Sequence, residues 1–295
     1  MNNTRFKSLL ADCHCERSEA NELQITNSLL LHEKGIKVEV NPARKLFCLL
    51  LSLLLIISGY SQKKTSAFPD CVRVSFQVTD STFPAHWYRA EINATATPLS
   101  SSEVDNVLNI LSQTLSKYPQ EVICKYLKHI YVFKRMQFYN VPFGGTSYKE
   151  TVYITDDEEN LTCSYDLLEN YFHHEFSSVL LSKNKCKLEK WKWRRLNPKG
   201  FRYGKGGLDA ILTGNAEMTF DPVLNERGFL THYSEASLEE DFNVYCQNVF
   251  NGGPEFWRLV ETYSKIREKT ELVIHFYHRI DISFTQENFI IRTEE

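Results

Sequence analysis

The sequence is best analysed outward from Tyr171-Phe172-His173-His174-Glu175-Phe176-Ser177-Ser178-Val179-Leu180-Leu181. Its apolar and polar residues recur with the period of a helix, so we expect a helix from about Ser164 to Leu181. On that helix His174 and Ser178 share one face, four residues apart, and Glu175 lies on the adjacent face. His173 is rotated by about 100° from His174.

A histidine followed by a glutamate is the first half of a metal-binding pattern found on helices. In the arrangement His-Glu-x-x-His, two histidines bind Zn²⁺ and the glutamate is the general base toward a metal-bound water. Here the fifth position is Ser178, whose hydroxyl stays protonated near neutral pH and is a poor zinc ligand. A weakly held ion is therefore expected, and Ser178 through a water, His173 or His232 are the open candidates for the remaining position.

A carboxylate on a later helix would complete a three-ligand zinc site. Glu240 is the candidate ligand, and Tyr233, seven residues earlier, is a candidate donor to an oxyanion. Both residues also have structural interpretations. Ser237 and Glu240 fit a capping box, in which the glutamate reaches back to the first amide of the helix, and Tyr233 could pack in the core.

These residues resemble the zinc-binding metallopeptidases secreted by Bacteroidetes, within the wider gluzincin group that includes anthrax lethal factor. The resemblance rests on His174-Glu175-Phe176 and on Tyr233 followed by Glu240-Asp241-Phe242. It implies a zincin-like fold, Zn²⁺ held by His174 and Glu240, and a peptide or protein substrate. It further implies that Glu175 and Tyr233 are the catalytic base and the oxyanion donor.

The chain also departs from that family. Ser178 replaces the second histidine, and Asn243-Val244 stand where the family helix carries Ala-Glu. The first hypothesis is therefore a secreted zinc metallopeptidase-like hydrolase. The alternative is a catalytically inactive zincin-fold pseudoenzyme, or an exported binding protein for a peptide or glycan.

The N-terminal region predicts export. A basic pair, Arg44-Lys45, precedes the apolar run Leu46–Ile57, and Gly59 and Ser61 supply small residues for cleavage. This pattern is typical of a signal peptide over residues 44–61, and its apolar run is too short for a stable membrane span. A short uncleaved anchor is the alternative. We expect residues 1–43 to be a disordered or wrongly assigned leader and the protein to be periplasmic, cell-surface or extracellular.

Residues 62–295 predict a single α+β domain, with an N-terminal mixed sheet and the His174 helix followed by a mainly helical part. The expected strands are Val72–Val78, His129–Phe133 and Thr151–Ile154, and the expected helices are residues 101–118, 164–181, 237–250, 255–267 and 272–280. Gly144-Gly145-Thr146 indicates an edge strand or a turn that another group approaches closely. Lys185–Asp221 is expected to be mostly loop.

Composition excludes some partners. The formal net charge of -3 gives no reason to expect nucleic-acid binding. The short basic and aromatic run Lys190–Arg195 is better explained as a loop that packs its tryptophans onto the domain. Five cysteines follow the signal peptide at irregular spacing, so one or two disulfides are possible and no pairing is assigned.

Overall fold

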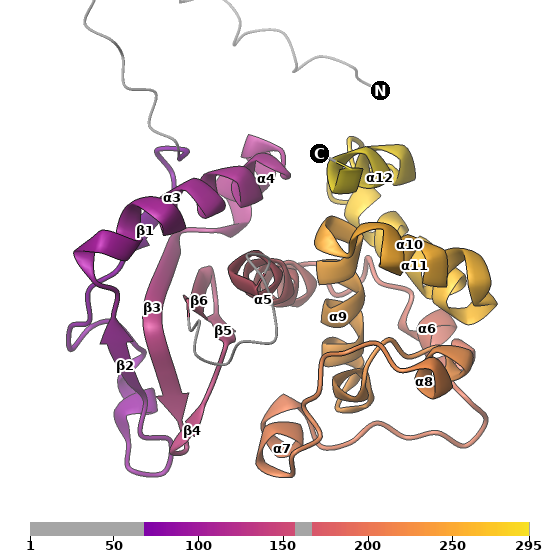
Figure 1. The fold of residues 1–295 in the computed structure, drawn as a ribbon, viewed down its shortest axis with the longest axis horizontal. Coiled ribbons are helices and arrows are strands. Elements are labelled where there is room, and N and C mark those ends of the chain that lie inside the picture. The colour runs from indigo at the N-terminus through magenta and orange to yellow at the C-terminus, as the bar shows by residue number, and fades with distance from the viewer. Residues whose placement is uncertain (1–67, 157–166, 295) are drawn as a thin grey trace, which may run out of the picture. The chain divides into compact units, whose positions relative to one another are not determined.

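A computed structural model describes residues 68–156 and 167–294, which belong to one compact unit, Thr65–Glu295. The predicted leader and signal peptide lie outside these residues. In chain order the elements are β1 (Arg73–Ser75), η1 (Ala85–Tyr88), β2 (Thr95–Pro98), α3 (Ser101–Ser116), α4 (Gln120–Tyr126), β3 (His129–Phe138), β4 (Val141–Pro142), β5 (Gly145–Tyr148), β6 (Thr151–Thr155), α5 (Leu167–Lys183), α6 (Lys190–Leu196), α7 (Gly207–Leu212), α8 (Pro222–Arg227), η3 (His232–Glu235), α9 (Leu238–Asn251), α10 (Gly253–Thr262), α11 (Ser264–His278) and α12 (Gln286–Glu294) (Figure 1).

The described strands form one mixed sheet around β3. The main order is β1-β3-β6-β5, with β1 and β6 parallel to β3 and β5 antiparallel to β6. β2 and β4 pair antiparallel with the second half of β3. A mixed sheet followed by helices confirms the expected α+β class.

Several local predictions were wrong. The helix break expected between residues 267 and 272 falls at Tyr263, between α10 and α11. Only Arg73–Ser75 of the strand expected over Val72–Val78 forms β1, because β2 pairs with β3 from Phe133 onward. Lys185–Asp221 is mostly loop, as expected, but the run Lys190–Arg195 that was expected to be loop lies in α6, and α7 follows at Gly207–Leu212. α6 exists because Trp193 is fully buried and binds another element, which is a tertiary contact that local composition does not reveal.

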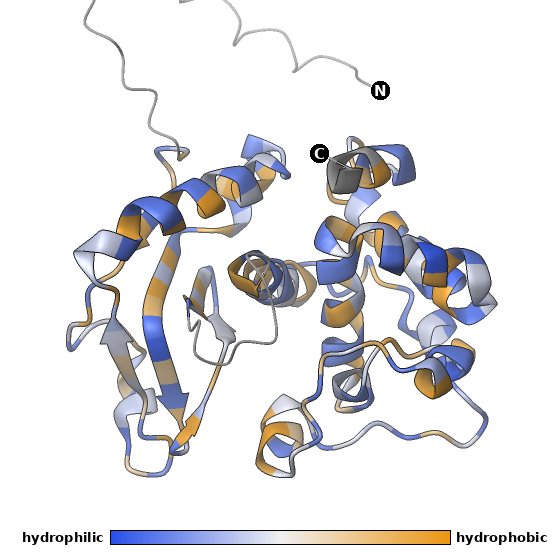
Figure 2. Ribbon diagram, in the orientation of Figure 1, coloured by the Kyte–Doolittle hydropathy of each residue, from blue (hydrophilic) through white to orange (hydrophobic). Residues whose placement is uncertain are grey.

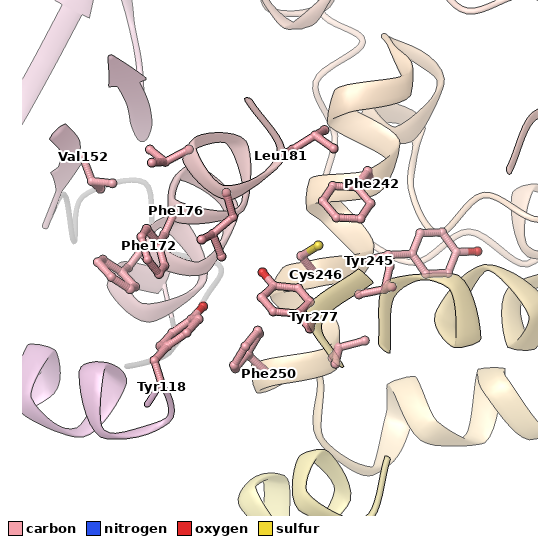
Figure 3. Close-up of a cluster of buried hydrophobic side chains, with 14 of the residues drawn as sticks. Tyr118, Val152, Phe172, Phe176, Leu181, Phe242, Tyr245, Cys246, Phe250 and Tyr277 are labelled. Carbon is pink, nitrogen blue, oxygen red and sulfur yellow. The ribbon is translucent and has the colours of Figure 1, made fainter. Parts of the chain in front are cut away.

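The main core lies between α5, one face of the sheet and α9. Phe172 and Phe176 on α5 are fully buried, as are Ile130 and Val152 on the strands. Figure 3 shows the aromatic rings that continue this core toward α9, where Tyr118 lies 4.5 Å from Phe250, measured between ring centroids. α5 is therefore held on two sides, which fixes the direction of its polar side chains.

The opposite face of the sheet carries a second, smaller core built around Phe83, Phe133 and Tyr153. Figure 2 shows hydrophobic and hydrophilic bands along β3, which supplies residues to both cores. Because successive side chains of a strand point to opposite faces, one strand can serve both layers.

A disulfide joins Cys71, just before β1, to Cys124 on α4. The thiols of Cys186 and Cys246 are unpaired, the first exposed and the second buried. Within residues 68–156 and 167–294, no helix combines the length and apolar character needed to cross a membrane.

Candidate functional site

The central pair of the site is formed by His174 on α5 and Glu240 on α9. His174 Nε2 lies 2.9 Å from Glu240 Oε2. α9 begins after Ser237, whose Oγ accepts from the Glu240 backbone N–H at 3.0 Å. The capping interpretation is thus right for Ser237, but the Glu240 carboxylate binds the imidazole. Two residues 66 positions apart in the sequence meet as expected.

The other imidazole nitrogen, His174 Nδ1, lies 2.9 Å from Oε1 of Gln247, which is two turns after Glu240 on α9. Both partners are acceptors, so the ring donates from both nitrogens when it is protonated. Burial alone would lower the pKa of His174, but the Glu240 carboxylate raises it to about 9. At neutral pH the His174 ring is therefore in its charged imidazolium form.

Glu175 lies beside this pair and against β5. A Cβ added at Gly145 would come within 2.8 Å of Glu175 Cγ, so only glycine allows this approach. Burial, and secondarily the charge of Glu240, raise the pKa of Glu175 to about 7, although His174 and a hydrogen bond from Ser147 act in the opposite direction. A carboxyl group that titrates near neutral pH can exchange protons at working pH.

Tyr233 completes the cluster from η3. Its ring centroid lies 5.9 Å from that of His174. Its hydroxyl bonds the Glu240 carboxylate, and burial followed by the charge of Glu240 raises its pKa. A Cβ added at Gly207, the first residue of α7, would lie 2.3 Å from the Tyr233 hydroxyl and 2.4 Å from Glu240 Oε1. The backbone of α7 therefore borders the site directly.

Ser178 belongs to a separate hydrogen-bonded group on the same side of α5. Its Oγ donates to Glu239 Oε1 at 2.9 Å and accepts from Asn243 Nδ2 at 2.7 Å. The serine at the position of the second histidine thus links α5 to the first turns of α9. Both of these hydrogen bonds of its hydroxyl are made to side chains of the protein.

The two other histidines considered as ligands have different partners. His173 is fully buried, with Nδ1 2.7 Å from the Tyr118 hydroxyl and Nε2 2.9 Å from Glu169 Oε1. His232 is exposed, and its Nε2 lies 3.9 Å from Asp221 Oδ2. Both rings are thus engaged with residues outside the His174–Glu240 pair.

The spacing and the number of possible ligand atoms test whether the site fits the expected zinc ion. Two ligand atoms of one tetrahedral zinc lie about 3.3 Å apart, and His174 Nε2 and Glu240 Oε2 approach that separation at 2.9 Å. A catalytic zinc site needs three protein ligands. Over residues 68–156 and 167–294, no group of three or more His, Cys, Asp or Glu side chains could hold a metal ion. The described residues therefore supply two of the three protein ligands that a catalytic zinc needs, His174 and Glu240.

Comparisons with known proteins add a distant resemblance. No protein-family model and no curated protein matches the chain. A solved structure from Bacteroides caccae, named a "putative zinc-binding metallo-peptidase", matches with 14% identity and a TM-score of 0.47. The match covers 76% of this chain and 85% of that chain.

Some residues of the site were not singled out from the sequence. Glu240, Asn243 and Gln247 lie three and four positions apart on α9, so they share one helical face. Asn243 and Gln247 are buried. The recurrence of polar residues at helical spacing after Glu240 was the signal that could have identified them.

Proposed function

We propose that this protein is a metallopeptidase-like binding protein that holds an extended peptide along β5 without cleaving it. One observation carries the proposal: β5 is the last strand in the described order β1-β3-β6-β5, on the side of the sheet next to α5. There Glu175 packs against Gly145 and accepts a hydrogen bond from the Ser147 side chain. A sheet edge beside a compact polar cluster is a suitable place for a polypeptide ligand.

The hydrogen-bond alternation of the β5–β6 pair supports this assignment. Thr155 N–H donates to Gly144 O at 2.9 Å, and the register continues through Gly145 opposite Ile154. In an antiparallel pair, alternate residues direct their backbone groups away from the partner strand. Gly145 and Ser147 are those residues on β5. Their N–H and C=O groups can pair with an added strand.

The incomplete donor set favours binding over zinc-dependent hydrolysis. His174 and Glu240 supply two ligand atoms, while the Ser178 hydroxyl bonds Glu239 and Asn243.

We also propose that the protein is exported. The Cys71–Cys124 disulfide supports this, because disulfides persist in oxidising compartments and are rare in the cytosol.

The test uses dye-labelled, carboxymethylated casein as an unfolded polypeptide probe, followed by fluorescence anisotropy. Ser147→Pro removes the outward N–H of β5, whereas Ser147→Ala removes only the side chain. We expect binding by the wild type and by Ser147→Ala, and loss of binding in Ser147→Pro. Equal affinity of both variants, or no binding by the wild type, would refute the proposal.

A second candidate is the zinc-dependent peptide hydrolase, with His174 and Glu240 holding the ion together with a ligand from outside the protein. It is favoured by the bond from His174 to Gln247, which orients the ring as metal-bound histidines are oriented. Glu175, whose pKa is raised to about 7, would be the general base. Tyr233 would donate to the oxyanion.

Calorimetric titration with Zn²⁺ and a casein-cleavage assay separate the two candidates. The binding protein should leave casein intact with or without added zinc. Cleavage that requires zinc and disappears in Glu175→Gln would instead establish the hydrolase.

A further inference from the structure

A buried ion pair lies behind the site, one residue from Glu240. Asp241 and Lys269 are both fully buried, and Lys269 Nζ lies 2.7 Å from Asp241 Oδ2. The same oxygen accepts from the Tyr203 hydroxyl at 2.6 Å and from Trp193 Nε1 at 2.9 Å. One carboxylate oxygen thus joins α9 to α6, to α11 and to the segment before α7.

Backbone hydrogen bonds connect the segment that follows Tyr203 to the site. Gly204 N–H donates to Glu235 O at 3.0 Å, and Gly206 N–H donates to Ala236 O at 3.0 Å. These bonds attach the segment that follows Tyr203 to η3 and its C-terminal neighbour. η3 carries Tyr233, and the next residue of the segment, Gly207, borders both Tyr233 and Glu240.

The Lys269 ammonium group makes a second connection. It donates to Gly228 O at 2.7 Å, at the end of α8 and shortly before η3. It also lies 4.3 Å from the ring centroid of Phe229 and 5.1 Å from that of Trp193. Lys269 therefore fixes the chain on the N-terminal side of Tyr233, while Tyr203 fixes the segment that covers it.

Successive residues of a helix differ by about 100° in direction. Asp241 consequently faces the core while Glu240 faces His174, and a displacement of Asp241 moves the first turn of α9. We propose that Asp241 and Lys269 are a positioning pair, which holds Glu240, Tyr233 and Gly207 in register with His174. The inference rests on the proposed function only where peptide affinity is the readout.

The sharpest test is Tyr203→Phe, which keeps the ring and the ion pair but removes a hydroxyl that donates to Asp241 and accepts from Asn197 and Trp193. The matched control is Tyr126→Phe, which removes a buried tyrosine hydroxyl that bonds Asn184 at the end of α5. The readouts are the NMR signals of the His174 ring and the affinity for labelled casein, both measured on folded protein. We expect Tyr203→Phe to shift the ring signals and to weaken binding about tenfold, with neither change in Tyr126→Phe.

A second variant separates positioning from stability. Asp241→Leu with Lys269→Met replaces the ion pair by apolar side chains, which often preserves or improves stability. A positioning role predicts displaced His174 signals and weaker casein binding despite wild-type resistance to urea. If this variant does not fold, Tyr203→Phe decides.

Wild-type ring signals and affinity in Tyr203→Phe, or in a folded double variant, would overturn the inference. If the wild-type protein binds no casein, the proposed function fails, and the His174 signals alone test the positioning role.

Discussion

Two consecutive histidines on α5 have opposite surroundings. His173 faces the core, where its ring lies 4.6 Å from that of Phe250 and bonds Tyr118 and Glu169. His174 faces α9 and bonds Glu240 and Gln247. Each ring has one carboxylate partner, yet burial lowers the pKa of His173, whereas the pKa of His174 is raised to about 9.

Burial is the main cause of the lowered pKa of His173, and Lys117, which pairs with Glu169 at 2.6 Å, lowers it further. Around His174 the effect of burial is outweighed by Glu240, with further contributions from Glu175 and Gln247. The further partner of Glu240 is the neutral hydroxyl of Tyr233. A neutral histidine with a complete set of partners stabilises the fold. A charged one beside two carboxyl groups is suited to bind a polar ligand.

The largest expected effect concerns the core histidine. His173→Ala leaves a cavity and removes partners from Tyr118 and Glu169, so we expect a loss of about 3–4 kcal/mol in the free energy of unfolding. Urea denaturation measures it. Casein affinity of the folded fraction should be unchanged.

His174→Gln, which can keep one hydrogen bond to Glu240, should cost less stability and abolish casein binding. The reverse outcome would show that the two roles are exchanged.

Acidification should destabilise the protein by protonating Glu169, the carboxylate partner of His173. Burial would raise the pKa of Glu169, but bonds from His173 and Lys117 lower it from 4.5 to about 2. A lowered folded-state pKa contributes stability that is complete above the unfolded value and is lost as the pH falls through the folded value. We expect this carboxylate to contribute at most about 3 kcal/mol, lost between about pH 4.5 and pH 2.

The measurement is the urea midpoint as a function of pH, with Glu169→Gln as the control that removes this titration. An acid dependence that is the same in the variant would assign the loss to other carboxylates.

The smallest expected effect is a gain of function on the His174 side. Ser178→His restores a second imidazole one turn from His174. Because an outer partner of a metal ligand is already worth 10–100-fold in affinity, an added ligand should strengthen Zn²⁺ binding by more than about tenfold. Calorimetry measures the change. Ser182→His adds a histidine at an exposed position of the same helix, and an equal gain there would mean non-specific binding.

Part of the site could be predicted because helical periodicity places residues on faces. The pattern around His174 indicated the helix, and the acidic turn after Ser237 indicated the start of α9. The close approach expected at Gly144-Gly145 is confirmed, since Glu175 packs on Gly145. The metal and catalytic roles of His174, Glu175, Tyr233 and Glu240 remain predictions.

The part of the site that could not be predicted depends on how α5 and α9 are rotated against each other. Gln247 and Asn243 acquire partners only once α9 faces α5, which no local pattern specifies. The Cys71–Cys124 pair required knowledge of where α4 lies relative to β1. β1 is short because a later strand competes for the same edge of β3.

The disulfide has a practical consequence for biochemistry on this protein. It closes a loop across a sequence separation of 53, and the chain-entropy model gives such a cross-link about 4 kcal/mol. That is a large fraction of the roughly 5–15 kcal/mol by which native proteins are stable. Protein made in a reducing host, or stored with a thiol, could therefore be substantially unfolded at body temperature. Inactivity measured on such material would describe the preparation and not the native molecule.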